Sequence, residues 1–265
     1  MKLITRALKE IYDTLYRAYG PQGWWPVRSG AQKRGQDKRL RGGEPASVRN
    51  TCSPDDRGYH PGNYEIPAAS AEKFEVAVGA ILTQNTAWTN VELSLSLLRN
   101  KRLLSPQAII SAPPSKLSRL IRSSGYYNQK ALKLKGFADA CTAHGWFSGR
   151  VVPAREELLA VWGIGEETAD SILLYAFHHP RFVVDAYTRR LFSRLGFIEE
   201  KQAYPAIQAV FEKNLPPERI LFNEYHALIV EHAKRHCRKR PRCAGCMLTR
   251  RCRFHTTACH ATIDG

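Results

Sequence analysis

The stretch that decides the fold spans residues 158–169 and reads Leu-Leu-Ala-Val-Trp-Gly-Ile-Gly-Glu-Glu-Thr-Ala. An apolar helix end meets a Gly-Ile-Gly turn at residues 163–165, and a new helix then begins. Two glycines permit a tight turn, and the free N–H groups at the start of the second helix suit a phosphate. Such a turn also serves packing alone, and Glu166 and Glu167 suit any helix start because they favour its dipole. The stretch therefore predicts a helical hairpin that either binds phosphate or only packs.

Helical patterns continue on both sides of this hairpin, and glycines and prolines separate them. No segment shows a convincing strand alternation, so we predict an all-α fold. The expected helices cover residues 2–19, 71–84, 89–99, 106–110, 115–122, 128–143, 155–161, 167–177, 185–195, 201–214 and 217–235.

Length and composition exclude several classes of protein. With 265 residues, 43% of them hydrophobic, the chain can bury a core as one large or two small domains, which argues against disorder of the whole chain. Its longest uncharged apolar run, residues 76–82, is far shorter than the roughly 20 residues that cross a bilayer. Residues 1–20 alternate charged and apolar residues at helical spacing, unlike a signal peptide. We expect a soluble, monomeric cytoplasmic protein, associated with the nucleoid if the source is bacterial.

The positive charge is concentrated in two segments. Nine bases and no acid lie between Lys234 and Arg253, and eight bases and four acids lie between Arg28 and Arg57. These segments account for most of the net charge of +16. The pattern favours a polyanion such as nucleic acid, although two solvated basic loops are the plainer interpretation. Residues 28–69 are rich in Gly, Pro, Ser and Arg and lack aliphatic periodicity, which predicts a mobile arm.

Four cysteines form a cluster near the C-terminus with the spacing C-x5-C-x2-C-x5-C: Cys237, Cys243, Cys246 and Cys252. Thiolates this close together suit metal ligation, because the intervening loops can wrap one centre. Disulfides are the alternative, which the scattered Cys52, Cys141 and Cys259 do not favour. Spacing alone does not separate zinc from a [4Fe–4S] cluster. We expect a structural metal site.

Asp185 follows the apolar run Phe182-Val183-Val184 and precedes an expected helix. From the residues alone, the favoured interpretation is a helix N-cap. A capping carboxylate at the mouth of a cleft can also take part in catalysis.

Several separated motifs occur in an order that resembles the helix-hairpin-helix DNA glycosylases of the endonuclease III superfamily. The resemblance covers about residues 74–252 together with the first 26 residues. The matching motifs are Phe74-Glu75, Ile81-Leu82-Thr83-Gln84-Asn85-Thr86, Gly125-Tyr126-Tyr127-Asn128-Gln129-Lys130-Ala131, the hairpin turn, Val184-Asp185 with Arg189, and the cysteine cluster.

The resemblance implies a two-lobed helical fold that binds double-stranded DNA with a damaged base. Residues 71–182 would form a six-helix lobe with the hairpin, and residues 1–26 would join residues 183–265 in a lobe with a [4Fe–4S] cluster, zinc being the less favoured metal. Residues 27–70 would be a flexible basic insert without a counterpart. The damaged nucleotide would flip out of the helix into the cleft between the lobes.

The resemblance also implies roles for individual residues. Asp185 matches the catalytic aspartate, and Gln84 matches the residue that helps to fill the gap left by the flipped base. The hairpin would contact DNA through Gly163, Ile164, Gly165 and Thr168, and the cysteine loop could present basic residues such as Arg238 and Lys239 to phosphates.

One departure from the family pattern predicts the reaction type. Members that also cleave the DNA strand carry a lysine immediately before the Thr-Ala of the hairpin helix, where this chain has Glu167. A carboxylate cannot form the Schiff base that β-elimination requires. We therefore expect a monofunctional DNA glycosylase that leaves the abasic site intact.

The N-terminal segment predicts the substrate. Trp24, Trp25 and Pro26 are similar to a segment in the 3-methyladenine DNA glycosylase III branch, where the tryptophans and the phenylalanine matching Phe74 line the base pocket. An aromatic box suits a cationic alkylated purine, because each cation–π contact contributes about 0.5–2 kcal/mol. The alternative is that both tryptophans are core residues.

Some features leave other functions open. Some members of that branch lack the cysteines, the first cysteine spacing is x5 where x6 is common, and 47 residues separate Pro26 from Phe74. An endonuclease III-like glycosylase for oxidised pyrimidines or mismatched bases is one alternative. A non-catalytic, metal-stabilised DNA-binding protein is the other.

Overall fold

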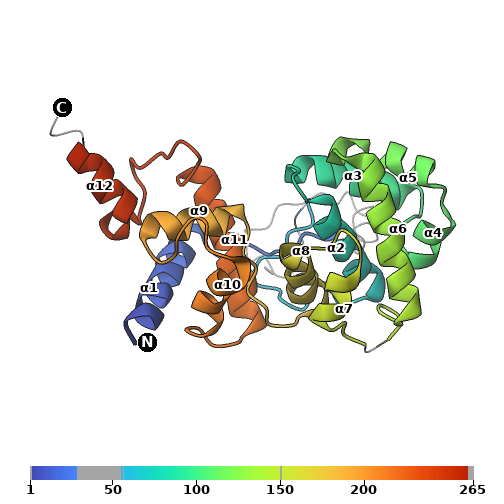
Figure 1. Ribbon diagram of the computed structural model, residues 1–265, viewed down its shortest axis with the longest axis horizontal. Helices are drawn as coiled ribbons and strands as arrows, with labels where there is room; N and C mark the ends of the chain where they lie inside the picture. Colours follow the sequence, from blue (N-terminus) through green and yellow to red (C-terminus); the bar gives the residue numbers. More distant parts are fainter. Residues whose placement is uncertain (1, 29–54, 56, 150, 262–265) are drawn as a thin grey trace, which may run out of the picture. The chain divides into compact units, whose positions relative to one another are not determined.

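The computed structural model describes residues 2–28, 55, 57–149 and 151–261, and every regular element in these ranges is a helix (Figure 1). The predicted all-α class is confirmed. None of the described helices is long and apolar enough to cross a bilayer. The chain divides into two compact units: the hairpin unit, residues 23–179, and the cysteine unit, residues 1–22 with residues 180–265.

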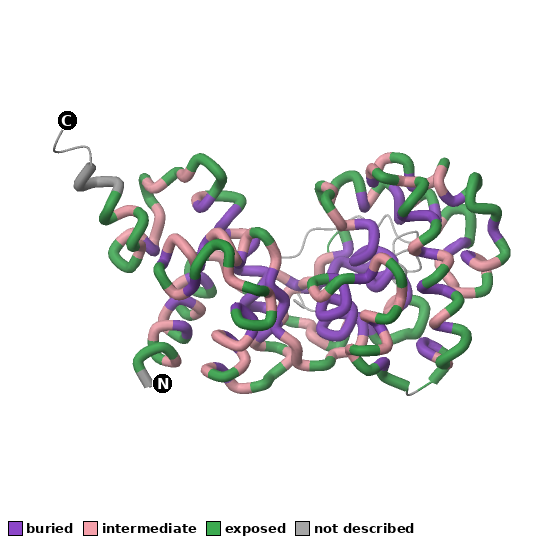
Figure 2. The backbone as a smooth tube through the Cα atoms, in the orientation of Figure 1, coloured by how far each residue is buried: buried purple, intermediate pink, exposed green. Residues whose placement is uncertain are grey.

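The hairpin unit is built around α2, whose residues from Phe74 to Leu82 are all buried. α2 packs against α3, α6, α8 and the helical turn that follows α8. Figure 2 shows the buried backbone concentrated along these central helices. The elements of the unit are α2 (Ser70–Leu82), α3 (Trp88–Asn100), α4 (Pro106–Ser111), α5 (Pro114–Leu120), the 3₁₀ turn η2 (Arg122–Ser124), α6 (Tyr127–Ala143), α7 (Arg155–Ala160), α8 (Glu166–Ser171) and the π-helical turn η3 (Ile172–Ala176).

The π-helical turn replaces the end of the α-helix that the sequence predicts over residues 167–177. All five of its residues are buried. A π-turn holds more residues than an α-turn, so the following side chains are rotated about the helix axis. Periodicity along an apolar run does not reveal this change, because every side of the turn is apolar and packed.

The cysteine unit contains α1 (Lys2–Tyr19), α9 (Ala186–Leu195), α10 (Tyr204–Glu212), α11 (Arg219–Arg235), the 3₁₀ turn η4 (Thr249–Arg251) and α12 (Arg253–Ala261). α11 packs against both α1 and α9. Leu8, Ile11 and Leu15 form the buried stripe of α1, and the hydroxyl of Tyr225 in α11 donates to the carbonyl oxygen of Leu8 at 2.8 Å. The sequence does not predict α12, which packs against α9.

The unit boundaries differ from the lobes expected from the sequence. The first boundary falls after Gln22, whose N–H donates to Glu224 at 2.6 Å within the cysteine unit. Trp24 and Trp25 belong to the hairpin unit instead, because their rings pack on Tyr175. The second boundary falls before Pro180 rather than after residue 182, because Phe182 stacks on Phe211 of α10 at 3.8 Å.

The expected flexible insert over residues 27–70 is packed in its described part, while residues 29–54 and 56 lie outside the described residues. Val27 N–H donates to Gly58 O at 3.0 Å, and His60 N–H donates to Gly23 O at 3.1 Å. The buried ring of His60 also lies 2.8 Å from the carbonyl oxygen of Trp25. The described part of this stretch is therefore packed through contacts such as that of His60 with Trp25, 35 positions earlier, and the flexibility of the insert stays a prediction.

Candidate functional site

The hairpin turn lies between α7 and α8, as the sequence predicts. Gly163 has a φ of +83°, in the region that favours glycine, and a Cβ there would lie 2.5–2.7 Å from side-chain carbons of Lys133. Ile164 is buried, and Gly165 is the N-cap residue of α8, with open space around its missing Cβ. Trp162 is 63% exposed. The two glycines thus differ. The fold requires glycine at position 163, whereas Gly165 leaves the N-terminus of α8 free of a side chain.

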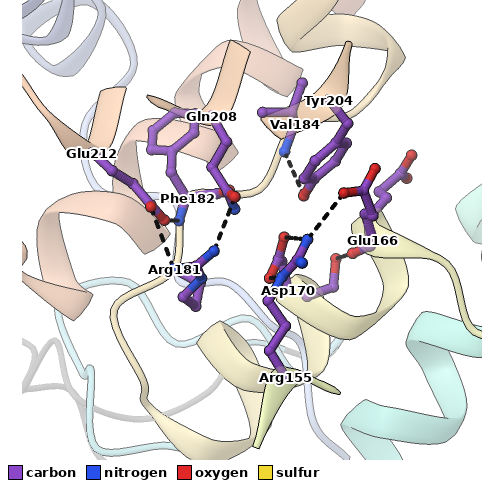
Figure 3. A network of polar contacts seen from close by, with 11 residues as sticks. Arg155, Glu166, Asp170, Arg181, Phe182, Val184, Tyr204, Gln208 and Glu212 are labelled. Carbon is purple, nitrogen blue, oxygen red and sulfur yellow. Dashed lines mark hydrogen bonds and ion pairs between the residues drawn. The ribbon is translucent and has the colours of Figure 1, made fainter. Parts of the chain in front are cut away.

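A buried ion pair fixes the two helices of the hairpin to each other. Asp170 in α8 is fully buried, and Arg155 in α7 donates to its two carboxylate oxygens at 2.8 and 3.1 Å (Figure 3). Arg155 also lies 3.4 Å from Glu166. A paired guanidinium and carboxylate of this geometry set the spacing of the helices.

Gln84 lies beyond the end of α2 and contacts the hairpin directly. Its Nε2 donates to the carbonyl oxygen of Gly163 and to the hydroxyl of Thr168, both at 3.0 Å. Its Oε1 accepts from Lys133 Nζ at 2.6 Å. The structure therefore joins Gln84, Gly163 and Thr168, three residues that the resemblance assigns to DNA binding.

Lys130 connects two of the motifs on which the resemblance rests. Its side chain is buried, and Nζ donates to Leu82 O at 2.8 Å, Thr86 Oγ1 at 2.7 Å and Ser124 O at 2.6 Å. Three acceptors match the three donors of an ammonium group. Burial, with a smaller effect of Lys133, lowers the pKa of Lys130 to about 8.

The residues expected to line a base pocket fall into two aromatic groups. Half-buried Trp24 and buried Trp25 contact Tyr175 with ring centroids at 6.2 and 5.2 Å, and Trp25 also meets Trp88 at 5.2 Å. Pro26 beside them is buried.

Phe74 is fully buried in the second group, where it packs on Phe137 and Phe147. None of the ring contacts of the described residues joins Phe74 to Trp24 or Trp25. Phe74 thus makes its ring contacts on the α6 side of α2, and its place in a base pocket with the tryptophans stays a prediction.

Asp185 is the N-cap residue of α9 in the cysteine unit. Its Oδ1 accepts from the N–H of Thr188 at 2.7 Å, and its Oδ2 lies 3.5 Å from Nε2 of the buried His226 in α11. Burial by itself raises the pKa of Asp185, but His226 and the Thr188 contacts outweigh it and lower the pKa below the ordinary range of an aspartate. The cap thus holds a carboxylate that stays ionised at neutral pH.

Polar contacts from α10 hold the backbone that leads to Asp185. Glu212 accepts from Phe182 N–H at 2.9 Å, and Gln208 donates to Phe182 O at 2.8 Å. The hydroxyl of Tyr204 accepts from Val184 N–H at 3.3 Å (Figure 3). The position of Asp185 is therefore fixed on both sides, by the contacts of the backbone that precedes it and by helix α9 that follows it.

The four cysteines line one hollow, together with apolar side chains such as Leu191, Leu195 and Leu248. Its empty volume is about 350 Å³, including the part open to solvent. All four are free thiols, so the disulfide alternative is wrong for this cluster; Cys52 and the side chain of Cys259 lie outside the described residues.

Two arginines of α9 hold the cysteine loop. Arg190 donates to Cys237 O at 2.7 Å, and Arg194 lies 3.2 Å from Cys237 Sγ while donating to Arg238 O at 2.6 Å and Lys239 O at 2.9 Å. Arg238 and Lys239 themselves are exposed.

The donor set fits an iron–sulfur cluster. Each iron of a [4Fe–4S] cluster takes one thiolate, so its four ligands surround a hollow, as these cysteines do. Within the described ranges, no group of three or more His, Cys, Asp or Glu side chains is arranged to hold a single metal ion. The adjacent Arg194 guanidinium suits thiolates, because it places a positive charge beside them.

Sequence reasoning missed several residues of the candidate site. His226 lies 41 positions after Asp185, inside a helix whose pattern indicates only packing. Tyr175 lies in an apolar run, and Lys133 is one of several lysines in α6. No local sequence pattern identifies these residues, because each one contacts a partner that is distant in the sequence.

Comparisons with known proteins agree with the observed fold. The family described as HhH-GPD superfamily base excision DNA repair protein matches residues 78–217. A protein of Methanocaldococcus jannaschii named as a DNA repair glycosylase is 38% identical over 250 residues, which cover 92% of this chain and 94% of that protein.

Two solved structures are also similar. Endonuclease III in a non-covalent complex with DNA matches with a TM-score of 0.61 and 25% identity, over 71% of this chain and 86% of the other. The H. pylori 3-methyladenine DNA glycosylase MagIII bound to 1,N6-ethenoadenine matches with a TM-score of 0.55 and 31% identity, over 65% and 92%.

Proposed function

Because this chain belongs to the HhH-GPD superfamily and is a DNA glycosylase of base excision repair, we propose that it is monofunctional and excises alkylated purines such as 3-methyladenine. The observation that carries the proposal is Asp185, an ionised carboxylate fixed at the start of α9. Excision breaks the bond between the sugar C1′ and the base nitrogen, and water then adds to C1′.

Asp185 suits electrostatic stabilisation of that reaction. As the glycosidic bond breaks, positive charge develops on the sugar, and a fixed carboxylate stabilises it. A lowered pKa keeps the negative charge in place but makes the group a weak base. The role that we assign to Asp185 is therefore to stabilise the oxocarbenium-like sugar and to orient the water.

Glu167 supports base release without strand cleavage. It takes the place of the lysine that would form a Schiff base with the opened sugar, and a carboxylate cannot form that bond. The reaction then ends at the abasic site. Endonuclease III-like relatives make strand cleavage the alternative to be tested.

The aromatic group around Trp24 supports a cationic purine as substrate. Trp24, Trp25 and Tyr175 lie in ring contact, and stacking with cation–π attraction favours a base that carries positive charge. An N-alkylated purine leaves as a neutral base with the electrons of the broken bond, so it needs little help from an acid. The 31% identity to a 3-methyladenine DNA glycosylase supports the same class.

Oxidised pyrimidines or mismatched bases are the second candidate substrates. Phe74 makes its ring contacts with Phe137 and Phe147 rather than with the tryptophans, which gives less support to a single aromatic box. The 25% identity to endonuclease III favours this candidate.

The cofactor that we propose is a [4Fe–4S] cluster held by Cys237, Cys243, Cys246 and Cys252. When bound, the cluster supplies cross-links that hold the loop rather than chemistry at the base. The loop then presents the exposed Arg238 and Lys239, which suit DNA phosphates.

One assay tests the function. The protein is incubated with methylated DNA, thymine-glycol DNA and DNA with a G·T mismatch, and free base and strand nicking are measured separately. We expect base release from methylated DNA without nicking, and loss of that release in Asp185→Asn. Strand nicking that persists in Asp185→Asn contradicts the proposal. Normal base excision by that variant would show that Asp185 serves only as a helix cap.

The pH dependence sharpens this test. Asp185 has a lowered pKa, so the contribution of its negative charge is complete above the ordinary pKa of an aspartate and is lost only as the pH falls through the lower pKa of the folded state. Asp185 therefore stays ionised from about pH 8 to about pH 5. The ratio of wild-type to Asp185→Asn excision rates should be constant over that range. A ratio that falls towards 1 at about pH 5 would show that Asp185 titrates there.

A further inference from the structure

The carboxamide of Gln84 is held by contacts from two other parts of the hairpin unit. Its two N–H groups are directed to Gly163 O and Thr168 Oγ1, and its oxygen accepts from Lys133 Nζ. A primary amide has two hydrogens to donate, so both are used. The side chain of Gln84 is consequently fixed in one rotamer.

Lys133 determines which way the carboxamide faces. An ammonium group can only donate, and the carbonyl oxygen of Gly163 can only accept. Turning the amide around would place its NH₂ against Lys133 and its oxygen against Gly163 O, and both contacts would be lost. The orientation in the structure is thus the one that satisfies both neighbours.

Lys133 also touches the turn through its stem. A Cβ on Gly163 would lie 2.5–2.7 Å from three of the Lys133 side-chain carbons, so the stem crosses the face of this glycine. The ammonium group then reaches Gln84 at 2.6 Å. One side chain from α6 thus contacts both the hairpin turn and Gln84.

We propose that Lys133 is a positioning residue for base flipping, whose ammonium group fixes Gln84 to the hairpin turn. The residue that fills the gap in the DNA and the turn that contacts the phosphates then act as one rigid element. This inference rests on the proposed function, because it takes Gln84 as the gap-filling residue and the hairpin as a DNA contact.

The neighbouring lysines have other partners, which makes Lys133 distinct. Lys130 Nζ donates to Leu82, Thr86 and Ser124, and Lys135 Nζ donates to carbonyl oxygens that include those of Ile110 and Ala112. Both lysines hold elements within the fold. Lys133, only partly buried, instead donates to the side chain of Gln84, the proposed gap-filling residue.

The variant Lys133→Met tests the proposal, because methionine keeps an unbranched stem over Gly163 and removes the ammonium group. Lys116→Met, at an exposed position in α5, is the matched control for the loss of one positive charge. The assay uses the damaged duplex from which the wild type releases a base, with 2-aminopurine beside the lesion to report unstacking, at saturating protein. We expect Lys133→Met to lower the single-turnover rate about tenfold and to reduce the 2-aminopurine signal.

Binding to undamaged duplex separates positioning from loss of charge. Lys133→Met should change this affinity no more than Lys116→Met does. A rate and a fluorescence signal equal to those of Lys116→Met overturn the proposal.

A double-mutant cycle asks whether Lys133 acts through Gln84. If it does, Lys133→Met should change the excision rate less than about twofold once Gln84→Ala is present, because the group that it positions is gone. A full tenfold loss on top of Gln84→Ala shows that Lys133 acts elsewhere, and that result overturns the proposal.

A measurement without DNA separates this proposal from the proposed function. In nitrogen-15-labelled protein, we expect the side-chain amide of Gln84 to exchange with solvent about tenfold faster in Lys133→Met than in the wild type. Unchanged exchange means that Lys133 does not hold Gln84. A wild type that releases no base refutes the proposed function. The exchange measurement would still show whether Lys133 holds Gln84, because it uses no DNA.

Discussion

The hairpin turn and the cysteine loop are both expected to contact DNA, yet the chain holds them in different ways. The hairpin is held by Arg155 with Asp170 and by Lys133 with Gln84, all within one unit. The cysteine loop has backbone contacts from Arg190 and Arg194, but its four thiols surround a hollow. The difference teaches that side-chain contacts within the chain already hold the hairpin, while the proposed [4Fe–4S] cluster would complete the cysteine loop.

Removal of the proposed metal cluster should have the largest effect, and it should destabilise the cysteine loop without changing the hairpin. We expect Cys246→Ser to lose the iron and the characteristic visible absorption, and hydrogen exchange to rise in residues 237–252. A structural zinc site contributes on the order of 10 kcal/mol to the fold that it holds, and we expect an effect of that order here. Residues 155–171 should keep their protection because their contacts use no metal. Cys141→Ser, outside the cluster, is the matched control.

A protein that is colourless, zinc-loaded and active would refute the iron–sulfur assignment. If hydrogen exchange in Cys246→Ser rose equally in both units, the hairpin would also depend on the metal, and the distinction would be refuted.

The ion pair of Arg155 and Asp170 should give the next largest effect. Asp170→Asn removes the buried carboxylate and leaves the partly exposed Arg155 guanidinium with the more distant Glu166, so we expect a loss of about 3 kcal/mol in the free energy of unfolding. The double variant Arg155→Met with Asp170→Leu should recover a large part of it, because no unpaired charge remains. Denaturant unfolding measures both. A double variant no more stable than Asp170→Asn would mean that the pair itself is required.

The two glycines of the turn offer a sharper test inside the hairpin. Gly163→Ala forces a side chain into positive φ against the Lys133 stem, so we expect a loss of about 2 kcal/mol in stability. Gly165→Ala meets open space at a φ of −95° and should leave stability nearly unchanged. If the start of α8 contacts a DNA phosphate, Gly165→Ala should weaken DNA binding although its stability is nearly unchanged. Equal melting temperatures of the two variants would contradict this distinction.

The smallest effect concerns the exposed bases of the cysteine loop. Replacing Arg238 or Lys239 with serine should lower the slope of log K against log salt by about one unit for each lost phosphate contact. Lys116→Ser, in the hairpin unit, is the control. A slope that matches this control for both variants would show that the loop does not contact the backbone.

The parts of the molecule that the sequence predicts best are those with local signals. Helix α9 has an aspartate cap and a C-terminal glycine, and α6 begins after Gly125; both were placed within about two residues. The hairpin turn follows from Gly163 and Gly165, since the steric freedom of glycine belongs to the residue itself.

Other features of the fold depend on distant partners, which local signals do not reveal. The stretch after residue 57 has the composition of a mobile arm, yet His60 is buried against Trp25. Helix α12 contains neighbouring threonines and little apolar periodicity, and it packs on α9 nonetheless.

The sequence by itself determined the helical class, the turn at Gly163, the capping position of Asp185 and the cysteine cluster, because spacing and backbone preference are local properties. Only the tertiary structure decided that His226 faces Asp185, that Phe74 packs on Phe137, and that Lys133 contacts Gln84. These pairs join helices far apart in the chain. Their geometry depends on how the helices pack and on which polar groups are left to satisfy one another, and no local pattern encodes it.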